Sequence, residues 1–475
     1  MKQKLTFIFI AGIFILSSCT NKKASWIVTT DENRWVQQAD ISLAKATDKE
    51  SYVEIQVDLP QQTIDGFGGC FNELGWDALQ SVDEVTRTRI LNDLFDPSAD
   101  GLKFNFCRTP MGANDYARNW YSYDEVDGDF EMKHFSIERD QEAVIPYIKA
   151  ALAINPAIKI WASPWSPPTW MKTNKHYANK SAECNDLQKD KEVPLYTDQF
   201  IQEPQYLQAF ALYFSKYLDA YKAEGIDVSM VVYQNEAFTF NQWPNSSWHP
   251  KSIAHFNGKY LGPQLAKTHP EVELYIGTFN TADTLIYETV LNDPDCQKYI
   301  KGVCLQWEGR DAISFVKNKY PELKLMQSES ECGNGKFSWK DAEHTFDLMK
   351  RYINDGANSY MNWNMALKDD GVSGWCWKQN ALIRIMSDTK EVIYTPEYYV
   401  YKHLTSFVPK GSVRLPVQAV NGEEYDNLLA FQTPENTIII VLANYRTAAK
   451  TVTLKIAEQY LTVELPANSF NTIKI

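Results

Sequence analysis

The feature of this sequence that most constrains its fold is an alternation of short apolar runs with longer stretches of helical periodicity. Stretches such as 205–224 and 338–354 carry apolar residues at helical spacing. Eight short runs have the length of buried strands, at 63–67, 103–107, 159–162, 229–233, 273–277, 302–305, 324–327 and 359–361. Strands that alternate with helices are typical of a parallel sheet. Eight of them predict an α/β fold, a closed (β/α)8 TIM barrel.

Both ends of the chain have a different pattern, in which apolar and polar residues alternate. Residues 52–57 follow it, and similar runs return near the C-terminus at 428–432, 437–443, 450–455 and 471–475. A period of two indicates half-buried strands. The N-terminal side alone has too few strands for a sheet. We therefore expect segments 26–62 and 405–475 to join in one β-sandwich, appended to a barrel at 63–404.

The first residues are similar to an export signal. Lys2 and Lys4 precede an apolar run at 5–16, and small residues lead to Cys19. The run is short for a membrane span, so residues 1–18 are predicted to be a signal peptide outside the fold. Its end is similar to the cleavage site of a bacterial lipoprotein, which predicts lipid attachment at Cys19 and a membrane-anchored place in the cell envelope. An ordinary secretory signal with a chance Cys is the alternative.

Composition narrows the class of ligand. The net charge of -13 argues against a nucleic-acid partner, because phosphate binding requires a basic surface. The 14 Trp and 26 Tyr offer planar rings that stack on sugars, although aromatic-rich cores are an equally common cause. The Cys residues other than Cys19 show no CxxC spacing, so neither a zinc site nor another metal or cofactor is expected, and any disulfide pairing is left open.

Polar groups suited to a sugar follow nearly every predicted barrel strand. Glu236 follows the fourth and Glu329 the seventh. In such a barrel the working residues lie where strands end. Hydrolysis of a glycosidic bond with retention requires two carboxyl groups about 5 to 5.5 Å apart, one to protonate the leaving oxygen and one to attack the anomeric carbon. The sequence therefore predicts that the two glutamates face each other across the barrel mouth.

Two other acids compete with Glu329 for the attacking role, Glu331 and Glu308. Residues two apart on a strand share a face, so parity does not separate Glu329 from Glu331. Distance does, because about 3.3 Å per residue places Glu331 about 6.6 Å further along, too far for attack if Glu329 is correctly placed. The apolar run ends just before Ser328, which predicts Glu329 at the strand tip and Glu331 in the loop.

Four neighbours fit a sugar site. Asn235 is suited to bond the sugar 2-hydroxyl. Trp165 and Trp363 are predicted to form apolar walls, which also raise the pKa of a nearby carboxylic acid. Arg108 either binds substrate or ties its strand end to Asp115.

These residues lie in segments that resemble glycoside hydrolase family 30, which includes lysosomal glucosylceramidase and bacterial and fungal β-1,6-glucanases. The likeness covers nearly the whole chain after the signal peptide. The segments are Asp65-Gly66-Phe67-Gly68-Gly69, Arg108-Thr109-Pro110-Met111 with Asp115, Ser163-Pro164-Trp165 through Met171-Lys172-Thr173-Asn174, Asn235-Glu236, Leu261-Gly262-Pro263, Ser328-Glu329, Asn362-Trp363-Asn364 and Leu465-Pro466-Ala467-Asn468-Ser469.

The resemblance implies that Glu236 is the acid/base and Glu329 the nucleophile. It also implies a glucose subsite, lined by Arg108, Asp115, Trp165, Asn235, Trp363 and Asn380. Two positions depart from the family pattern. Ala237 stands where the family often has Pro, and the glucosylceramidase-like aromatic after strand six is replaced by a segment that includes Glu308.

The leading expectation is a retaining β-glycoside hydrolase that acts on β-1,6-glucan, because an envelope enzyme meets polysaccharide more often than sphingolipid. Glucosylceramide is the second candidate substrate. Xylan is third, since Asp115 and Trp165 match a glucose-binding pattern. A non-catalytic sugar-binding lipoprotein is the alternative from another class, and it predicts the loss of one carboxylate.

Overall fold

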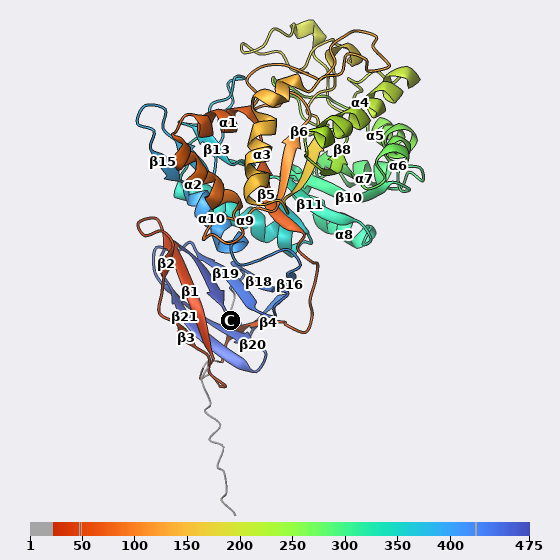
Figure 1. Ribbon diagram of the computed structural model, residues 1–475. Helices are drawn as coiled ribbons and strands as arrows, with labels where there is room; N and C mark the ends of the chain where they lie inside the picture. Colours follow the sequence, from red (N-terminus) through yellow and green to blue (C-terminus); the bar gives the residue numbers. More distant parts are fainter. Residues whose placement is uncertain (1–21, 47, 49, 423–424) are drawn as a thin grey trace, which may run out of the picture.

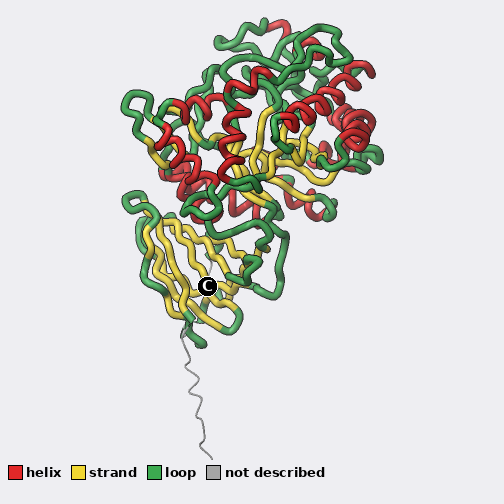
Figure 2. The backbone as a smooth tube through the Cα atoms, viewed as in Figure 1, coloured by secondary structure: helices red, strands yellow, loops and turns green. Residues whose placement is uncertain are grey.

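The middle of the chain forms a closed barrel of eight parallel strands. The computed structural model describes residues 22–46, 48, 50–422 and 425–475, and its barrel strands follow one another in chain order. They are β5 Gly66–Cys70, β6 Phe106–Pro110, β7 Lys159–Ser163, β8 Val228–Val232, β9 Glu273–Phe279, β10 Ile300–Gln306, β11 Lys324–Glu329 and β12 Ser359–Asn364. Figure 2 shows the strands in the middle of this domain, with helices around them. The predicted TIM barrel is confirmed.

Helices follow each barrel strand along the chain. They are α1 Glu73–Gln80, α2 Glu84–Phe95, α3 Val144–Ile154, α4 Pro204–Ala223, α5 Pro250–Phe256, α6 Gly262–Thr268, α7 Thr284–Leu291, α8 Ile313–Lys319, α9 Trp339–Asn354 and α10 Pro396–Thr405. Short helical turns are η1 Glu138–Glu142, η2 Thr169–Met171, η3 Lys189–Lys191, η4 Asn257–Leu261 and η5 Trp307–Asp311. Helix α9 shows why they form: Ser338 and Asp341 make a capping box, and Phe346, Met349 and Ile353 lie buried on one face.

Strands β5 and β6 each end three residues later than their apolar runs predict. The predicted strand ends at Phe67, but Gly68 and Gly69 continue β5, where the neighbouring strand passes close to them. A Cβ at Gly68 would lie 1.8 Å from the carbonyl oxygen of Phe106. In β6 the buried Arg108 continues the strand and pairs with Cys70. Because the charged Arg108 interrupts the apolar run, the hydrophobic pattern does not predict that β6 continues beyond Cys107.

The two chain ends form one β-sandwich, as predicted. One sheet has the order β16-β18-β19-β22-β1-β2, with β3 also paired to β1, and the other has the order β17-β4-β20-β21. The strands are β1 Lys23–Thr30, β2 Val36–Gln37, β3 Ile41–Ser42, β4 Tyr52–Ile55, β16 Val413–Leu415, β17 Val417–Val420, β18 Leu428–Gln432, β19 Ile438–Asn444, β20 Lys450–Ile456, β21 Gln459–Leu465 and β22 Ser469–Lys474. Figure 1 shows this sandwich below the barrel.

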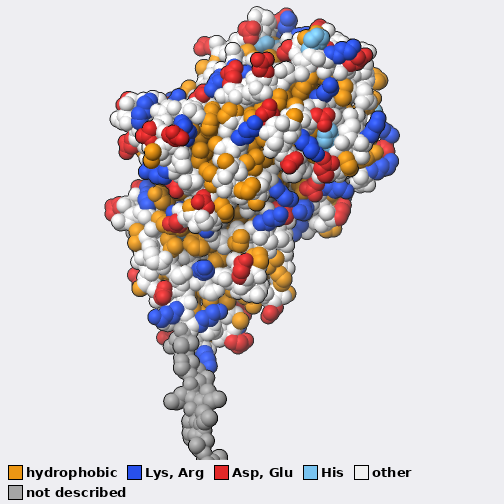
Figure 3. Space-filling model, viewed as in Figure 1, with side chains coloured by type: hydrophobic (Ala, Val, Ile, Leu, Met, Phe, Trp, Pro, Cys, Tyr) orange, Lys and Arg blue, Asp and Glu red, His pale blue; other side chains and the backbone are white. Residues whose placement is uncertain are grey.

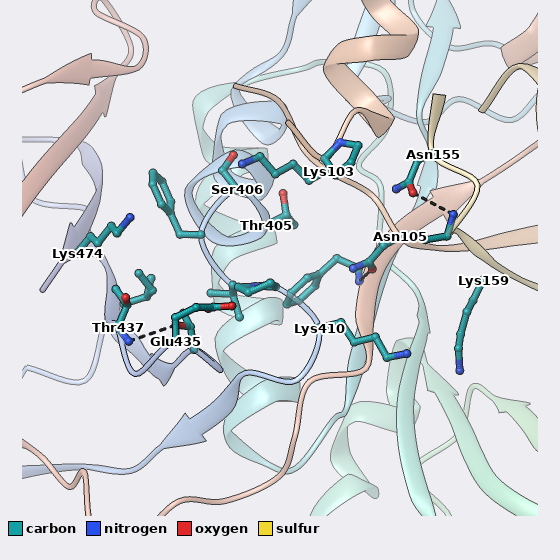
Figure 4. Close-up of a pocket in the computed structure, with 18 residues that line it drawn as sticks. Lys103, Asn105, Asn155, Lys159, Thr405, Ser406, Lys410, Glu435, Thr437 and Lys474 are labelled. Carbon is teal, nitrogen blue, oxygen red and sulfur yellow. Dashed lines mark hydrogen bonds between the residues drawn. The ribbon is translucent and has the colours of Figure 1, made fainter. Parts of the chain in front are cut away.

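The barrel and the sandwich meet along α10 and β22. His403 of α10 is fully buried, and its ring nitrogens lie 2.9 Å from the hydroxyls of Thr29 and Thr472, one in each terminal strand. Beside this junction lies a cavity of about 780 Å³. Figure 4 shows Lys103 and Ser406 on its barrel side and Lys474 on its sandwich side. This cavity lies among the N-terminal ends of barrel strands, away from the predicted site.

Between β12 and α10 the chain adds a small sheet of β13 Ala366–Lys368, β14 Ile383–Ile385 and β15 Val392–Tyr394. On the face of the molecule in Figure 3, acidic and basic side chains lie interspersed. Within the described ranges, no helix combines the length and apolar character needed to cross a bilayer. The proposed signal peptide and Cys19 lie outside the described residues.

Candidate active site

Glu236 and Glu329 both lie at the C-terminal ends of barrel strands. Glu329 is the last residue of β11, as predicted, and Glu236 follows β8 by four positions. Each side chain is 6% exposed. Glu236 has a φ of 45°, in the left-handed region that is rare for non-glycine residues. Its amide donates to Thr278 Oγ1 at 3.1 Å, which helps to hold this strained backbone in place.

Arg108 links the elements on which the site is built. From β6 its guanidinium donates to Glu329 Oε2 at 2.7 Å, to Asn235 Oδ1 at 2.7 Å and to Ser163 Oγ at 2.8 Å. Its carbon Cζ also lies 4.1 Å from the ring centroid of Trp165, which favours the cation. Arg108 therefore orients the nucleophile candidate. The alternative from the sequence was that Arg108 ties its strand end to Asp115. Among the described contacts, Arg108 has no hydrogen bond to Asp115.

A different set of partners holds Glu236. Gln306 Nε2 donates to its Oε1 at 2.7 Å, and Thr239 Oγ1 donates to its Oε2 at 3.0 Å. Ser328 Oγ in turn donates to Gln306 Oε1 at 2.8 Å. These are neutral donors, whereas Glu329 receives a cationic donor. The two carboxyl groups therefore have different environments, which is what an acid and a nucleophile require.

Sequence reasoning missed Thr239 and Thr278, and it assigned no role to Gln306. Thr278 Oγ1 donates to Asn235 Oδ1 at 3.1 Å in addition to its contact with Glu236. Thr278 directly follows the predicted fifth strand, so its place at a strand end was the available signal. Thr239 lies in the loop after β8 and carried no such signal.

Burial dominates the ionisation of the three carboxyl groups in the site. It raises the pKa of Glu236 above its ordinary value, and hydrogen bonds from Gln306 and Thr239 oppose the rise. Burial likewise raises the pKa of Glu329, against the attraction of Arg108. For Asp115, burial and then the nearby Glu236 raise the pKa to about 7. One guanidinium among three buried carboxyls favours a site that holds a proton near neutral pH.

Most of the residues predicted to line a glucose subsite lie around Asp115. Trp363 Nε1 donates to Asp115 Oδ2 at 3.1 Å, while Asp115 Oδ1 is buried and has no hydrogen-bond partner among the described residues. Such an acceptor is free for a sugar hydroxyl. The rings of Trp165 and Trp363 stack at 4.9 Å beside it. The structure thus brings Arg108, Asp115, Trp165, Asn235 and Trp363 into one cluster with the two glutamates.

Asn380 has a different set of contacts. Its Oδ1 accepts from the amides of Gly335 at 2.9 Å and Phe337 at 3.3 Å, and its Nδ2 donates to Glu397 at 2.5 Å. These bonds engage both ends of the amide. Asn380 therefore anchors the loop after β11, and its contact with a sugar stays a prediction.

The two competing acids have other surroundings. Glu331 Oε1 accepts a hydrogen bond from Arg310, and Glu331 Oε2 lies 3.0 Å from His344 Nε2. It lies beyond the end of β11, as predicted, and among the described residues no hydrogen bond joins it to Arg108. Glu308 lies in η5, is exposed, and lines a cavity next to Glu236.

That cavity, of about 330 Å³, adjoins the acid/base candidate. Aromatic rings dominate its wall, and Trp243 and Trp377 pack at 5.0 Å. Its other lining residues are Phe238, Thr239, Phe240, Asn241, Asn280, Trp307 and Glu308. We call it the leaving-group cavity, because it lies beside Glu236, the predicted acid. Among the described residues, no group of three or more His, Cys, Asp or Glu side chains could hold a metal ion.

Comparison with known proteins places this geometry in a family. The glycosyl hydrolase family 30 TIM-barrel domain matches residues 64–408, and the family 30 beta sandwich domain matches residues 411–473. Lysosomal acid glucosylceramidase of Mus musculus is 26% identical over 81% of this chain and 75% of its own. Endo-1,6-beta-D-glucanase neg1 of Aspergillus fumigatus is 26% identical over 75% of this chain and 72% of its own.

Solved structures share the fold over nearly the whole chain. SrfJ from Salmonella typhimurium superposes with a TM-score of 0.84 at 22% identity, covering 96% of this chain and 99% of that one. The endo-beta1,6-glucanase BT3312 superposes with a TM-score of 0.80 at 24% identity, covering 95% and 98%. The barrel match alone spans well over half of the sequence, so this chain belongs to glycoside hydrolase family 30 and is a glycosidase.

Proposed function

We propose that this chain hydrolyses β-glucosidic bonds with retention, through Glu329 as nucleophile and Glu236 as acid/base. The observation that carries this proposal is the contrast between two buried carboxyls, one paired with Arg108 and one held by neutral donors. An ionised Glu329 attacks the anomeric carbon while Glu236 gives its proton to the leaving oxygen. Glu236 then takes a proton from water, whose oxygen displaces Glu329 and restores the β configuration.

The proposed substrate is β-1,6-linked glucan. Support comes from the cavity beside Glu236, where Asn241, Asn280 and Glu308 offer hydrogen-bonding groups among the aromatic rings. Rings with polar neighbours suit a sugar as the leaving group, whereas ceramide offers two long apolar chains. The names of two similar proteins point the same way. Glucosylceramide is the second candidate, because a similar mouse protein is a glucosylceramidase.

Product analysis tests this proposal. The protein is incubated in parallel with β-1,6-glucan, gentiobiose, glucosylceramide and xylan, and products are separated and identified. We expect glucose or β-1,6-oligosaccharides from the first two substrates and a β-anomer as the first sugar in proton NMR. Faster turnover of glucosylceramide than of β-1,6-glucan would make glucosylceramide the proposed substrate. An initial α-anomer would overturn the mechanism. Sugar binding without turnover of any substrate would favour the non-catalytic alternative.

We further propose that the protein is anchored in a bacterial envelope membrane through lipid on Cys19. The support is the sequence alone, with a charged start, an apolar run and small residues before the Cys. Cys19→Ser is expected to abolish incorporation of labelled lipid and release the protein from the membrane fraction, while glycosidase activity stays unchanged. Normal labelling of the variant would contradict the anchor and favour a plain secretory signal.

A further inference from the structure

Two loops at the rim of the candidate site each carry one cysteine. Cys184 lies in the long connection between β7 and α4, in a loop at residues 179–193 that is closed at its base by the amide of Val193, which donates to the carbonyl of Asn179 at 3.0 Å. We call it the Cys184 loop. Cys376 lies near the tip of a hairpin at residues 371–379, between β13 and β14, which we call the Cys376 hairpin.

The two thiols contact each other. Both side chains are free thiols in the structure. Cys184 packs against the apolar cluster that contains Trp375, the residue before Cys376. Burial raises the pKa of the Cys184 thiol, and a hydrogen bond with Cys376 raises it further. Cys376 is exposed and Cys184 half-buried. The other five described cysteines are buried. This is therefore a pair of accessible sulfurs from segments far apart in the chain.

Two hydrogen bonds through Gln242 also connect the two segments, so the proximity of the thiols has support outside the cysteines themselves. Asn185, next to Cys184, donates to the carbonyl of Gln242 at 2.9 Å, and Gln242 donates to the carbonyl of Trp375 at 3.3 Å. Trp375 also packs on Trp120 at 4.8 Å. Cys376 itself has a φ of 56°, a rare backbone state that its surroundings must maintain.

The Cys376 hairpin also forms part of the wall of the leaving-group cavity. Trp377, the next residue, lines that cavity and packs on Trp243 at 5.0 Å. A bond at Cys376 would fix the hairpin and with it the position of the Trp377 ring. Since ordering a side chain before binding removes part of the entropy cost of association, the bond would favour substrates that reach this ring.

We propose that Cys184 and Cys376 form a reversible disulfide that ties the Cys184 loop to the Cys376 hairpin and thereby fixes the leaving-group cavity. The oxidant is a small or protein disulfide of an export compartment, where such bonds persist. The Cys376 thiolate attacks it, releasing one thiol. The Cys184 thiolate then attacks the mixed disulfide and releases the second. Two electrons pass to the oxidant, and the two cysteine protons end on its thiols through solvent.

Peptide mapping tests the bond itself and requires no catalytic activity. The full chain is treated with oxidised glutathione, free thiols are alkylated, and a non-reducing digest is analysed by mass spectrometry. We expect one linked peptide pair that joins Cys184 to Cys376 and disappears after reduction. The five buried cysteines are expected to remain thiols. Alkylation of both rim cysteines, or linkage of either one to another partner, would overturn the proposal.

Kinetics test the effect on the cavity, which rests on the proposed function. Reduction is expected to raise KM for a β-1,6-oligosaccharide by roughly 2- to 10-fold, with kcat on a small aryl β-glucoside unchanged. Cys376→Ser and Cys184→Ser should show the KM of the reduced protein under oxidising conditions. An equal KM in the oxidised and reduced forms would overturn the link to the cavity. A protein inactive on every glucoside would instead refute the proposed function and leave the mapping result standing.

Discussion

At the scale of single residues, the pairing of Glu329 with Arg108 separates the nucleophile candidate from its competitors. A 2-deoxy-2-fluoro glucoside with a good leaving group is expected to leave a covalent adduct on Glu329, found by peptide mapping. Glu331→Gln and Glu308→Gln are matched controls, and both should retain the adduct site and part of the turnover. A label on Glu331 or Glu308 would refute the assignment. Near-normal activity of Glu329→Ala would refute the site as a whole.

The raised pKa of Glu236 has a consequence for activity. Glu236 must be protonated to assist the leaving group, so turnover is expected to fall as pH rises through its pKa. Because burial raises that pKa above the ordinary value of 4.5, this fall in turnover should occur at higher pH than for an enzyme with an exposed Glu as its acid.

Glu236→Ala is the variant that checks this role. It is expected to lose about 10²- to 10⁴-fold on gentiobiose, and less on an aryl glucoside whose leaving oxygen requires little protonation. Added azide should restore turnover of the aryl glucoside by displacing the glycosyl group from Glu329. The rate of the glycosylation step should no longer fall at high pH in the variant. Equal losses on both substrates without azide rescue would place the acid elsewhere.

At the scale of one element, Asn380 secures the loop between β11 and α9. Asn380→Ala removes the acceptor of the Gly335 and Phe337 amides, and leaving such donors without partners costs about 1–3 kcal/mol of the free energy of unfolding. We expect a lower urea midpoint and a lower kcat, because the loop directly follows Glu329. KM for a small glucoside should change little. A large rise in KM at unchanged stability would instead indicate a direct sugar contact.

At the scale of the whole molecule, His403 couples the barrel to the sandwich and makes their association sensitive to acid. Burial lowers its pKa from 6.5 to about 3, so below pH 6.5 the unfolded chain binds more protons than the folded one. The stability that depends on neutral His403 is full above pH 6.5 and is lost as pH falls towards 3. Between pH 7 and pH 4 the loss amounts to about 3 kcal/mol.

Urea unfolding of the wild type and His403→Gln at both pH values measures this contribution. Other titrating groups are common to the two proteins, so they cancel in the comparison. We expect the wild type to lose about 3 kcal/mol more than the variant on acidification. Equal losses would show that His403 does not carry this linkage.

The fold class could be predicted from the sequence because periodicity is a local property of the chain. Eight apolar runs between helical stretches specify a barrel, and the alternation at both ends specifies the sandwich. The place of Glu329 at the tip of β11 also followed from the end of an apolar run. Local pattern was misleading at β5, where the strand continues through Gly68 because a neighbouring backbone passes too close for a side chain.

Partnerships between distant residues were decided only by the tertiary structure. Arg108 and Glu329 are 221 positions apart, and no spacing rule specifies that the guanidinium bonds this carboxylate instead of Asp115. The loop-anchoring contacts of Asn380 and the meeting of Cys184 with Cys376 depend likewise on how long loops pack. Periodicity determines which face of an element is buried, but it carries no information about which loop lies beside it. The path of a loop is set by packing and hydrogen bonds that form only once the barrel has closed.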